Sequence, residues 1–215
     1  MKRLAKISIA IFALLSLASV AANAQHLIST KAGFVNRSEG KVFILRQDSE
    51  GGEKGRVSLG TQMRDGDRIV TEADSRVELL LSPGSYIRLN ENSEIRAINT
   101  SFAQMRFELV KGSALTEIST ANEQASAITK NNPVEIVTPH GTVSVAKDGL
   151  YRFDVVETNT LVQVRQGELL VGNREQFLAK NAEKIGRGKA FKLTGNANAK
   201  LEIAKVNRDA ARSEE

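Results

Sequence analysis

The sequence predicts an all-β protein built from many short, mostly antiparallel strands. Apolar and polar residues alternate over short segments such as 86–89 and 94–98, which is the period of a half-buried strand. Glycine recurs between these segments beside proline, amide or basic residues, and such residues form tight turns. The expected strands follow one another at about 8–12 residues, a spacing typical of a sandwich or a solenoid-like arrangement.

The clearest predicted hairpin joins residues 77–81 to residues 85–89 through Pro83 and Gly84. Proline fixes φ at the first turn position, and glycine accepts the positive φ that the next position requires. A further strand, residues 94–98, follows a polar turn at residues 90–93.

A similar combination of glycine with basic or amide residues recurs three times downstream. It joins residues 107–110 to 113–115, residues 161–164 to 168–171, and residues 184–188 to 189–193. We expect turns of the same kind at these three points.

The predicted β domain, residues 33–195, divides into two successive β units. The first covers about residues 34–118 and the second about 133–195, joined by a polar linker at 119–132 that lacks alternation. Residues 196–215 are rich in alanine and charge, and we expect a short C-terminal helix or a disordered tail there.

The N-terminus has the pattern of a secretory signal peptide. Lys2, Arg3 and Lys6 precede an uncharged apolar run at residues 7–20, and we expect cleavage after Ala24 and a periplasmic location. The alternative is a retained anchor, but about 14–16 apolar residues are short against the ~20 that cross a bilayer. No cysteine follows the run and no second run reaches that length, so we expect neither a lipoprotein anchor nor a further membrane span.

Composition excludes several classes of protein. Without residues 1–24 the chain has 27 basic and 25 acidic side chains, a net charge of +2, whereas a nucleic-acid binder concentrates basic residues on one face. The chain has no cysteine, which excludes thiolate catalysis and cysteine metal sites. A chain this long can bury an adequate core without disulfides.

Several short motifs occur in the order found in FecR domains. The first is a leucine before a Gly-Asp-x-Ile-x-Thr turn, followed by a serine and a strand. A Gly-Ser hairpin comes next, and later a Thr-Pro-x-Gly turn between two strands. The residues are Leu59, Gly66, Asp67, Ile69, Thr71, Ser75, Gly84, Ser85, Thr138, Pro139 and Gly141. Over about residues 33–193, this series resembles the FecR domain family.

The resemblance implies a sensing, binding or scaffolding module of the periplasm. FecR-like proteins of iron uptake carry a cytoplasmic anti-sigma segment, a membrane helix and a periplasmic sensor that receives a signal from an outer-membrane transporter. Only about six residues precede the apolar run here, so we expect a soluble, secreted variant without the anti-sigma segment. The expected partner is another envelope protein, such as an outer-membrane transporter, a secretion component or a sensor, and not nucleic acid. The oligomeric state stays open.

The sequence offers no catalytic, cofactor or metal site, so we expect a protein that is not an enzyme and needs no cofactor. Its two histidines, His26 and His140, are 114 positions apart, whereas a metal site needs several ligands brought together. His140 is predicted to be a turn residue. Asp65 and Asp67 flank a glycine, but calcium requires further oxygen ligands, so this segment is also interpreted as a turn.

Five arginines gather in the first β unit, and a basic patch of this kind would bind an acidic partner or anionic lipid. Acidic residues interleave with them, which favours a solvated sheet face of balanced charge. The arginines are Arg64, Arg68, Arg76, Arg88 and Arg96, and the acidic residues are Glu72, Glu78 and Glu94.

Two functions therefore remain open. The first is a module that docks to another envelope protein through strand edges or loop tips. The second is a structural protein associated with glycan or the cell wall. The low aromatic content, 5%, disfavours strong sugar stacking and hence the second function.

Overall fold

The computed structural model describes residues 31–48, 54–119, 134–145, 147–172, 181–195 and 202–206. These residues form sixteen strands and no helix, so the all-β prediction is confirmed. Within them, no helix has the length and apolarity that a membrane crossing requires. The predicted signal peptide at residues 1–24, nearly all of the predicted linker, and His26 lie outside the described residues.

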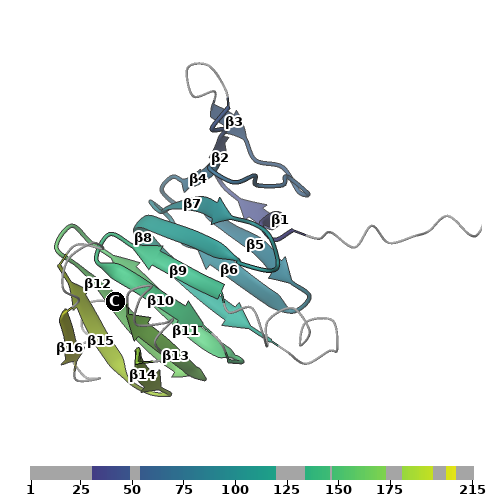
Figure 1. Ribbon diagram of the computed structural model, residues 1–215. Coiled ribbons are helices and arrows are strands. Elements are labelled where there is room, and N and C mark those ends of the chain that lie inside the picture. Colours follow the sequence, from purple (N-terminus) through teal and green to yellow (C-terminus); the bar gives the residue numbers. More distant parts are fainter. Residues whose placement is uncertain are drawn as a thin grey trace, which may run out of the picture.

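The strands form two sheets that share one long strand, β8 (Arg106–Ile118) (Figure 1). In order, the first sheet contains β3 (Lys54–Arg56), β2 (Val42–Leu45), β4 (Arg68–Thr71), β7 (Glu94–Asn99), β8, β9 (Val134–Thr138), β10 (Gly141–Val145), β13 (Glu168–Gly172) and β14 (Glu183–Gly186). The second contains β1 (Phe34–Glu39), β5 (Arg76–Ser82), β6 (Ser85–Leu89), β8, β11 (Gly149–Val155), β12 (Asn159–Gln166), β15 (Ala190–Thr194) and β16 (Glu202–Val206). Only β8 and β9 pair in parallel among the described strands.

From β9 onward the chain moves between the two sheets two strands at a time. The hairpins β9–β10 and β13–β14 belong to the first sheet, whereas β11–β12 and β15–β16 belong to the second. Each new hairpin pairs beside the earlier strands of its own sheet. The fold therefore combines the two layers of a sandwich with the stepwise growth of a solenoid, the two arrangements that the sequence left open.

Strand β8 crosses from one sheet to the other without a turn. Its first half, up to Lys111, pairs with β7, and its second half, from Gly112, pairs with β11. Gly112 has a φ of +81°, a left-handed conformation that side chains disfavour. The turn expected at Lys111 and Gly112 is thus wrong, because the glycine lets one continuous strand bend between sheets.

The other two glycine-containing junctions are also crossings between sheets and not hairpins. Gly167 separates β12 of the second sheet from β13 of the first, and Gly188 lies between β14 and β15. Both glycines have positive φ, +86° and +78°. The hairpin predicted at Pro83 and Gly84 is confirmed, because β5 and β6 pair directly.

One continuous core lies between the sheets. Inward-facing side chains alternate with outward-facing ones, as in β6, where Ile87 and Leu89 are buried and Tyr86 and Arg88 are partly exposed. The cluster of buried apolar residues runs from Ala32 to Leu193 and draws on strands of both predicted units. Each fully buried large side chain stabilises the fold by roughly 1.5–3 kcal/mol.

Near the C-terminus, Glu202–Val206 forms β16, which pairs with β15. This segment is a strand and not the expected helix or tail, because the free edge of β15 offers backbone groups that an extended segment can bond. The rest of residues 196–215 lies outside the described residues.

A buried tyrosine forms hydrogen bonds beside Gly167, where the chain crosses from β12 to β13. The hydroxyl of Tyr151 lies 2.9 Å from the carbonyl oxygen of Lys147 and 3.1 Å from that of Glu168, and it accepts a hydrogen bond from the Glu168 amide at 3.1 Å. The ring is 0% exposed. Burial raises the pKa of Tyr151 from 10.0 to about 12, because the phenolate would lose its hydration.

We expect the protein to lose roughly 2–3 kcal/mol of stability between pH 10 and pH 12 through this one group. The folded-state pKa lies above the unfolded value, so the contribution is complete below pH 10 and disappears as the pH rises towards 12. Urea unfolding of wild type and Tyr151→Phe across this range measures the loss. The Phe variant should start about 1–2 kcal/mol lower at pH 8 and then show a smaller alkaline loss.

Tyr86→Phe is the matched control, because the Tyr86 ring lies on the outer face of β6 and is partly exposed. This variant should keep the alkaline loss of the wild type. An equal loss in Tyr151→Phe and wild type would show that another group is responsible.

Candidate functional site: the Arg76 groove

The Gly-Asp-x-Ile-x-Thr motif around β4 forms structural contacts and no open site. Asp67 is 1% exposed, and its carboxylate accepts hydrogen bonds from Arg46 Nη1 at 2.5 Å and from the Arg64 amide at 2.8 Å. Ile69 belongs to the core. The Thr71 hydroxyl donates to the Asn90 carbonyl oxygen at 2.5 Å. The motif that carries the family resemblance therefore specifies turns and packing.

The predicted turn at Asp65 and Asp67 is confirmed, and its two carboxylates have separate protein partners. Asp65 Oδ1 accepts hydrogen bonds from the amide and the hydroxyl of Thr100, at 2.9 and 2.8 Å. Within the described residues, no group of three or more His, Asp and Glu side chains is placed to hold a metal ion.

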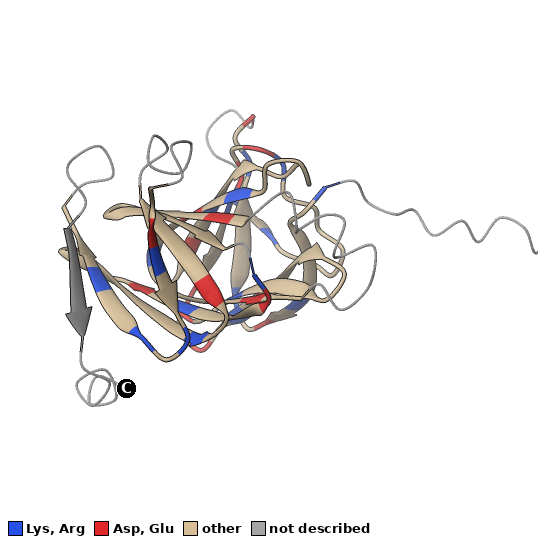
Figure 2. Cartoon of the chain, turned by 60° about the horizontal axis from the view of Figure 1, so that its bottom comes forward, with Lys and Arg blue, Asp and Glu red and all other residues tan. Residues whose placement is uncertain are grey.

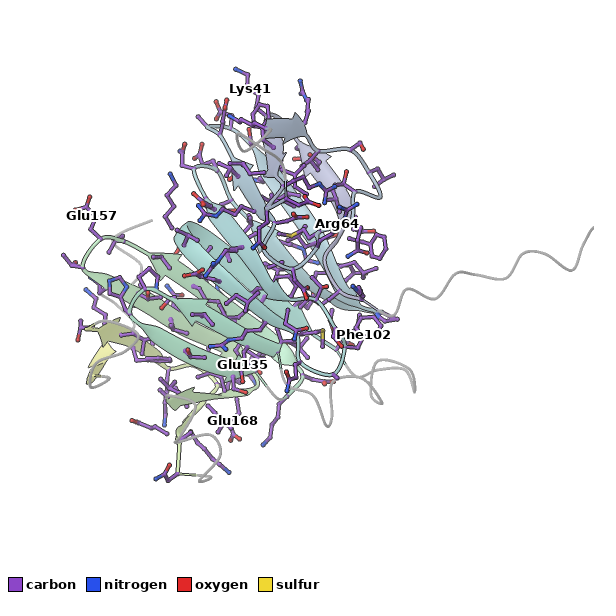
Figure 3. The ribbon with its side chains drawn as sticks, turned by 45° about the horizontal axis from the view of Figure 1, so that its top comes forward. Lys41, Arg64, Phe102, Glu135, Glu157 and Glu168 are labelled. Atoms are coloured by element: carbon purple, nitrogen blue, oxygen red, sulfur yellow. The ribbon has the colours of Figure 1, made fainter. Side chains whose placement is uncertain are left out.

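His140 lies in the β9–β10 turn, as predicted, but it is 5% exposed. Its Nδ1 lies 3.0 Å from Thr160 Oγ1, and its Nε2 donates to the Glu157 carbonyl oxygen at 3.2 Å. Thr160 in turn donates to Thr138 Oγ1 at 3.0 Å. The imidazole thus connects a turn of the first sheet to the β11–β12 hairpin of the second, where Figure 3 labels Glu157. Both ring nitrogens have protein partners, which assigns His140 a structural role.

The five arginines singled out in the sequence do not form one patch. Arg68 and Arg96 are neighbours in register on the first sheet and pair with Glu94 and Glu108, at 3.1 and 2.7 Å. Arg64 lies on a loop before β4, labelled in Figure 3. Figure 2 shows basic and acidic residues interleaved over the strands. This is the balanced, solvated surface that the interleaved signs favoured.

Arg88 is the centre of an ion triad on the outer face of the second sheet. Its Nε donates to Glu78 at 2.6 Å and its Nη1 donates to Glu117 at 2.7 Å. Burial raises the pKa of Glu78, but hydrogen bonds from Asn36 and Arg88 and the charge of Arg88 hold it below the ordinary 4.5. For Arg88, burial lowers the pKa and the two carboxylates raise it, with a net rise. Glu78 and Arg88 therefore stay charged and paired with each other at neutral pH.

Two adjoining hollows lie over β1, β5, β6 and β8 of the second sheet, and we call them together the Arg76 groove. The first has a volume of about 370 Å³ and the second about 460 Å³, and both are lined by Glu39, Arg76 and Asn90. The other charged side chains lining the first are Arg37, Glu78 and Arg88, and those lining the second are Asp74 and Glu91.

Arg76 is exposed at the junction of the two hollows, and its side chain forms no hydrogen bond or ion pair with the described residues. Its cross-strand neighbour Glu39 pairs instead with Arg37, at 2.5 Å. Glu78, two positions along β5, forms an ion pair with Arg88. The fold therefore presents an uncompensated guanidinium in a surface groove, which is a site for a negatively charged group.

One known protein family matches a region of the chain that contains most of its strands. The family model described as FecR protein matches residues 67–170. The chain carries a FecR domain. The match begins at the buried Asp67 and ends at Leu170, within β13, so strands β1–β3 and β14–β16 lie outside it. This is narrower than the stretch of about residues 33–193 over which the motifs resemble the family.

Two crystal structures, at 2.50 and 1.65 Å resolution and described as a "putative anti-sigma factor" of Parabacteroides distasonis, are similar to this chain. They are 19% and 18% identical to it, with TM-scores of 0.48 and 0.49. Each match covers 68% of this chain and 62% of the other, so this chain spans less than two thirds of that protein's length. No curated protein sequence matches the chain.

The sequence singled out Arg76 and Arg88 among the five arginines of the first β unit, and both line the first hollow. Nothing in it indicated that Arg88 is neutralised and Arg76 is not, because that difference depends on partners from β1 and β8. Asn90 was assigned only to a turn. No local signal marks its side chain as part of a groove.

Proposed function

We propose that this chain is a non-catalytic periplasmic module that senses or transmits signals in the bacterial envelope by binding another envelope protein. The FecR domain is a signalling and regulatory family, which supports the class of function. The observation that carries the proposal is the Arg76 groove, because an unpaired guanidinium on a sheet face is a point of attachment for a partner.

Three of the four edge strands among the described residues, β1, β3 and β14, favour docking through the sheet face over the addition of a strand. Strand β1 is interrupted by a bulge between Val35 and Arg37. Strand β3 has only three residues, and two of them are Lys54 and Arg56. Strand β14 has four and begins with a Glu-Lys pair. Bulges, short length and charge on an edge all oppose pairing with another chain.

The periplasmic location rests on the N-terminal pattern of a basic segment, an apolar run and small residues before Gln25. Cleavage after Ala24 would release the β domain as a soluble protein.

Capture in living cells tests this function. The full chain with a C-terminal tag is expressed in the native bacterium, crosslinked with formaldehyde, purified and identified with its partners by mass spectrometry. We expect reproducible enrichment of one envelope protein, and an N-terminus at Gln25 on the recovered chain. Recovery of background proteins alone would contradict docking, and co-sedimentation with purified cell wall would instead support the structural, glycan-associated role.

A further inference from the structure

We propose that the Arg76 groove binds an extended peptide segment of the partner protein that carries an isolated acidic residue. The carboxylate of that residue pairs with the Arg76 guanidinium and the Asn90 side-chain amide. The inference rests on the proposed docking function, and it adds the site and the chemistry of the group that the site recognises.

Arg76 is free because every neighbouring carboxylate except that of Asp74 is already engaged. Glu39 pairs with Arg37, and Glu78 accepts hydrogen bonds from Arg88 and from Asn36. Glu91 Oε2 accepts a hydrogen bond from the Asp74 amide at 2.7 Å. A guanidinium presents a planar set of donors that matches a carboxylate with two parallel hydrogen bonds. The guanidinium is carried by a strand that pairs on both sides, so binding requires no rearrangement of the fold.

Asn90 supplies a second donor at the same junction. Its backbone is fixed by hydrogen bonds to Ser113 and Thr71, whereas its side-chain amide has no hydrogen bond with the described residues. It lines both hollows together with Arg76. An amide NH₂ beside a guanidinium donates to the remaining lone pairs of a carboxylate.

The surrounding charges favour a single carboxylate over a phosphate or a polyanion. Four carboxylates line the groove, from Glu39, Asp74, Glu78 and Glu91, against three guanidinium groups. A doubly charged phosphate, an anionic lipid surface or an acidic run would be repelled by these carboxylates. One acidic side chain in an otherwise neutral or basic segment can pair with Arg76 and meets less of that repulsion, because it carries a single negative charge.

The second hollow favours a basic residue in the bound peptide. The carboxylate of Asp74 lines it and has no partner among the described residues, and Glu91 lies beside it. Side chains two positions apart in an extended peptide lie on one face, roughly 7 Å from each other. A basic residue two positions from the acidic one therefore suits this hollow, and the segment that we infer carries both.

Short peptides test the site on the purified, exported chain by NMR titration. The probes are three acetylated and amidated pentapeptides of Ser and Gly: one with a central Glu, one with a central Gln, and one with Glu and Lys two positions apart. The side-chain resonances of Arg76 and Asn90 report binding, and a Kd on the order of 1 mM is measurable in this way. We expect saturable shifts with the Glu peptide, tighter binding with the Glu–Lys peptide, and at least about fivefold weaker binding with the Gln peptide.

Three variants locate the interaction. Arg76→Gln removes the charge from an exposed side chain without partners among the described residues, so it should leave the backbone spectrum intact and weaken the Glu peptide about tenfold. Glu39→Gln removes a competing carboxylate and should tighten binding about twofold. Arg68→Gln is the matched control, because Arg68 pairs with Glu94 on the other sheet. This variant should bind the Glu peptide with the same Kd as the wild type.

Equal binding of the Glu and Gln peptides, or an Arg76→Gln variant that binds like wild type, would overturn the assignment. If the peptides do not bind while capture in cells recovers a partner, the docking function stands and the partner binds another surface. If the peptides bind as expected and capture recovers only background, the groove is a carboxylate site and the docking function is wrong.

Discussion

Replacing Asp67 with alanine is expected to destabilise the protein by about 3–4 kcal/mol. The carboxylate is 1% exposed and is the partner of Arg46, whose side chain is 30% exposed. It also accepts hydrogen bonds from the amides of Arg64 and Gln47. Removal would take one counter-charge away from a partly buried cation and the acceptor away from two backbone donors, and each loss costs free energy when water cannot replace the partner. Urea unfolding at pH 7 gives the change directly.

Two variants separate the parts of this effect. Asp67→Asn keeps an acceptor oxygen but removes the charge, and it should lie between wild type and Asp67→Ala. Asp48→Ala breaks an exposed pair with Arg64, in which the two side chains are 70% and 67% exposed, and it should change stability by less than about 0.5 kcal/mol. A loss below about 1 kcal/mol in Asp67→Ala would mean that the buried pair does not stabilise the fold.

Replacing Gly112 with alanine is the second change with a large expected effect, a loss of roughly 3 kcal/mol. The φ of +81° strains any side chain. A Cβ would also lie 2.6 Å from Ser93 Cα and 2.7 Å from Ser93 Cβ, and Ser93 is 0% exposed. Relief requires β8 to move at the point where it changes sheets. Urea or thermal unfolding measures the loss.

Two other glycines serve as matched controls for the backbone strain and for the close contact with Ser93. Gly60 has a φ of +79°, but a Cβ added there would have no atom within 4 Å, so Gly60→Ala isolates the conformational strain, about 1 kcal/mol. Gly186 has neither a positive φ nor a close neighbour, and Gly186→Ala should be neutral within about 0.5 kcal/mol. If Gly112→Ala cost no more than Gly60→Ala, the close approach to Ser93 would not matter.

The alternation of side chains and the Pro-Gly turn identified strands β5 and β6 because both are local properties of the sequence. The junctions at Gly112, Gly167 and Gly188 were misassigned for a physical reason. A glycine with positive φ reverses the chain in a hairpin, but it equally redirects the chain into the opposite layer. Local sequence cannot separate these outcomes, since the choice depends on which neighbouring strand offers free backbone groups.

The polar residues show the same limit. His140 was assigned correctly to a turn, yet its burial depends on Thr160, 20 positions away. The balanced charge of the first unit followed from interleaved signs in the sequence. Which arginine stays unpaired did not, because Arg88 finds Glu117 only when β6 and β8 lie side by side.

The sharing of β8 has a consequence for cooperativity. Its hydrogen bonds hold β7 and β9 on one side of the bend and β6 and β11 on the other. Neither sheet can separate without breaking the pairing of β8, which is also a central strand of the other sheet. The two described sheets should therefore unfold together and not one after the other. We therefore expect a single unfolding transition, and a chain divided between residues 119 and 134 should yield two fragments that fold only when recombined.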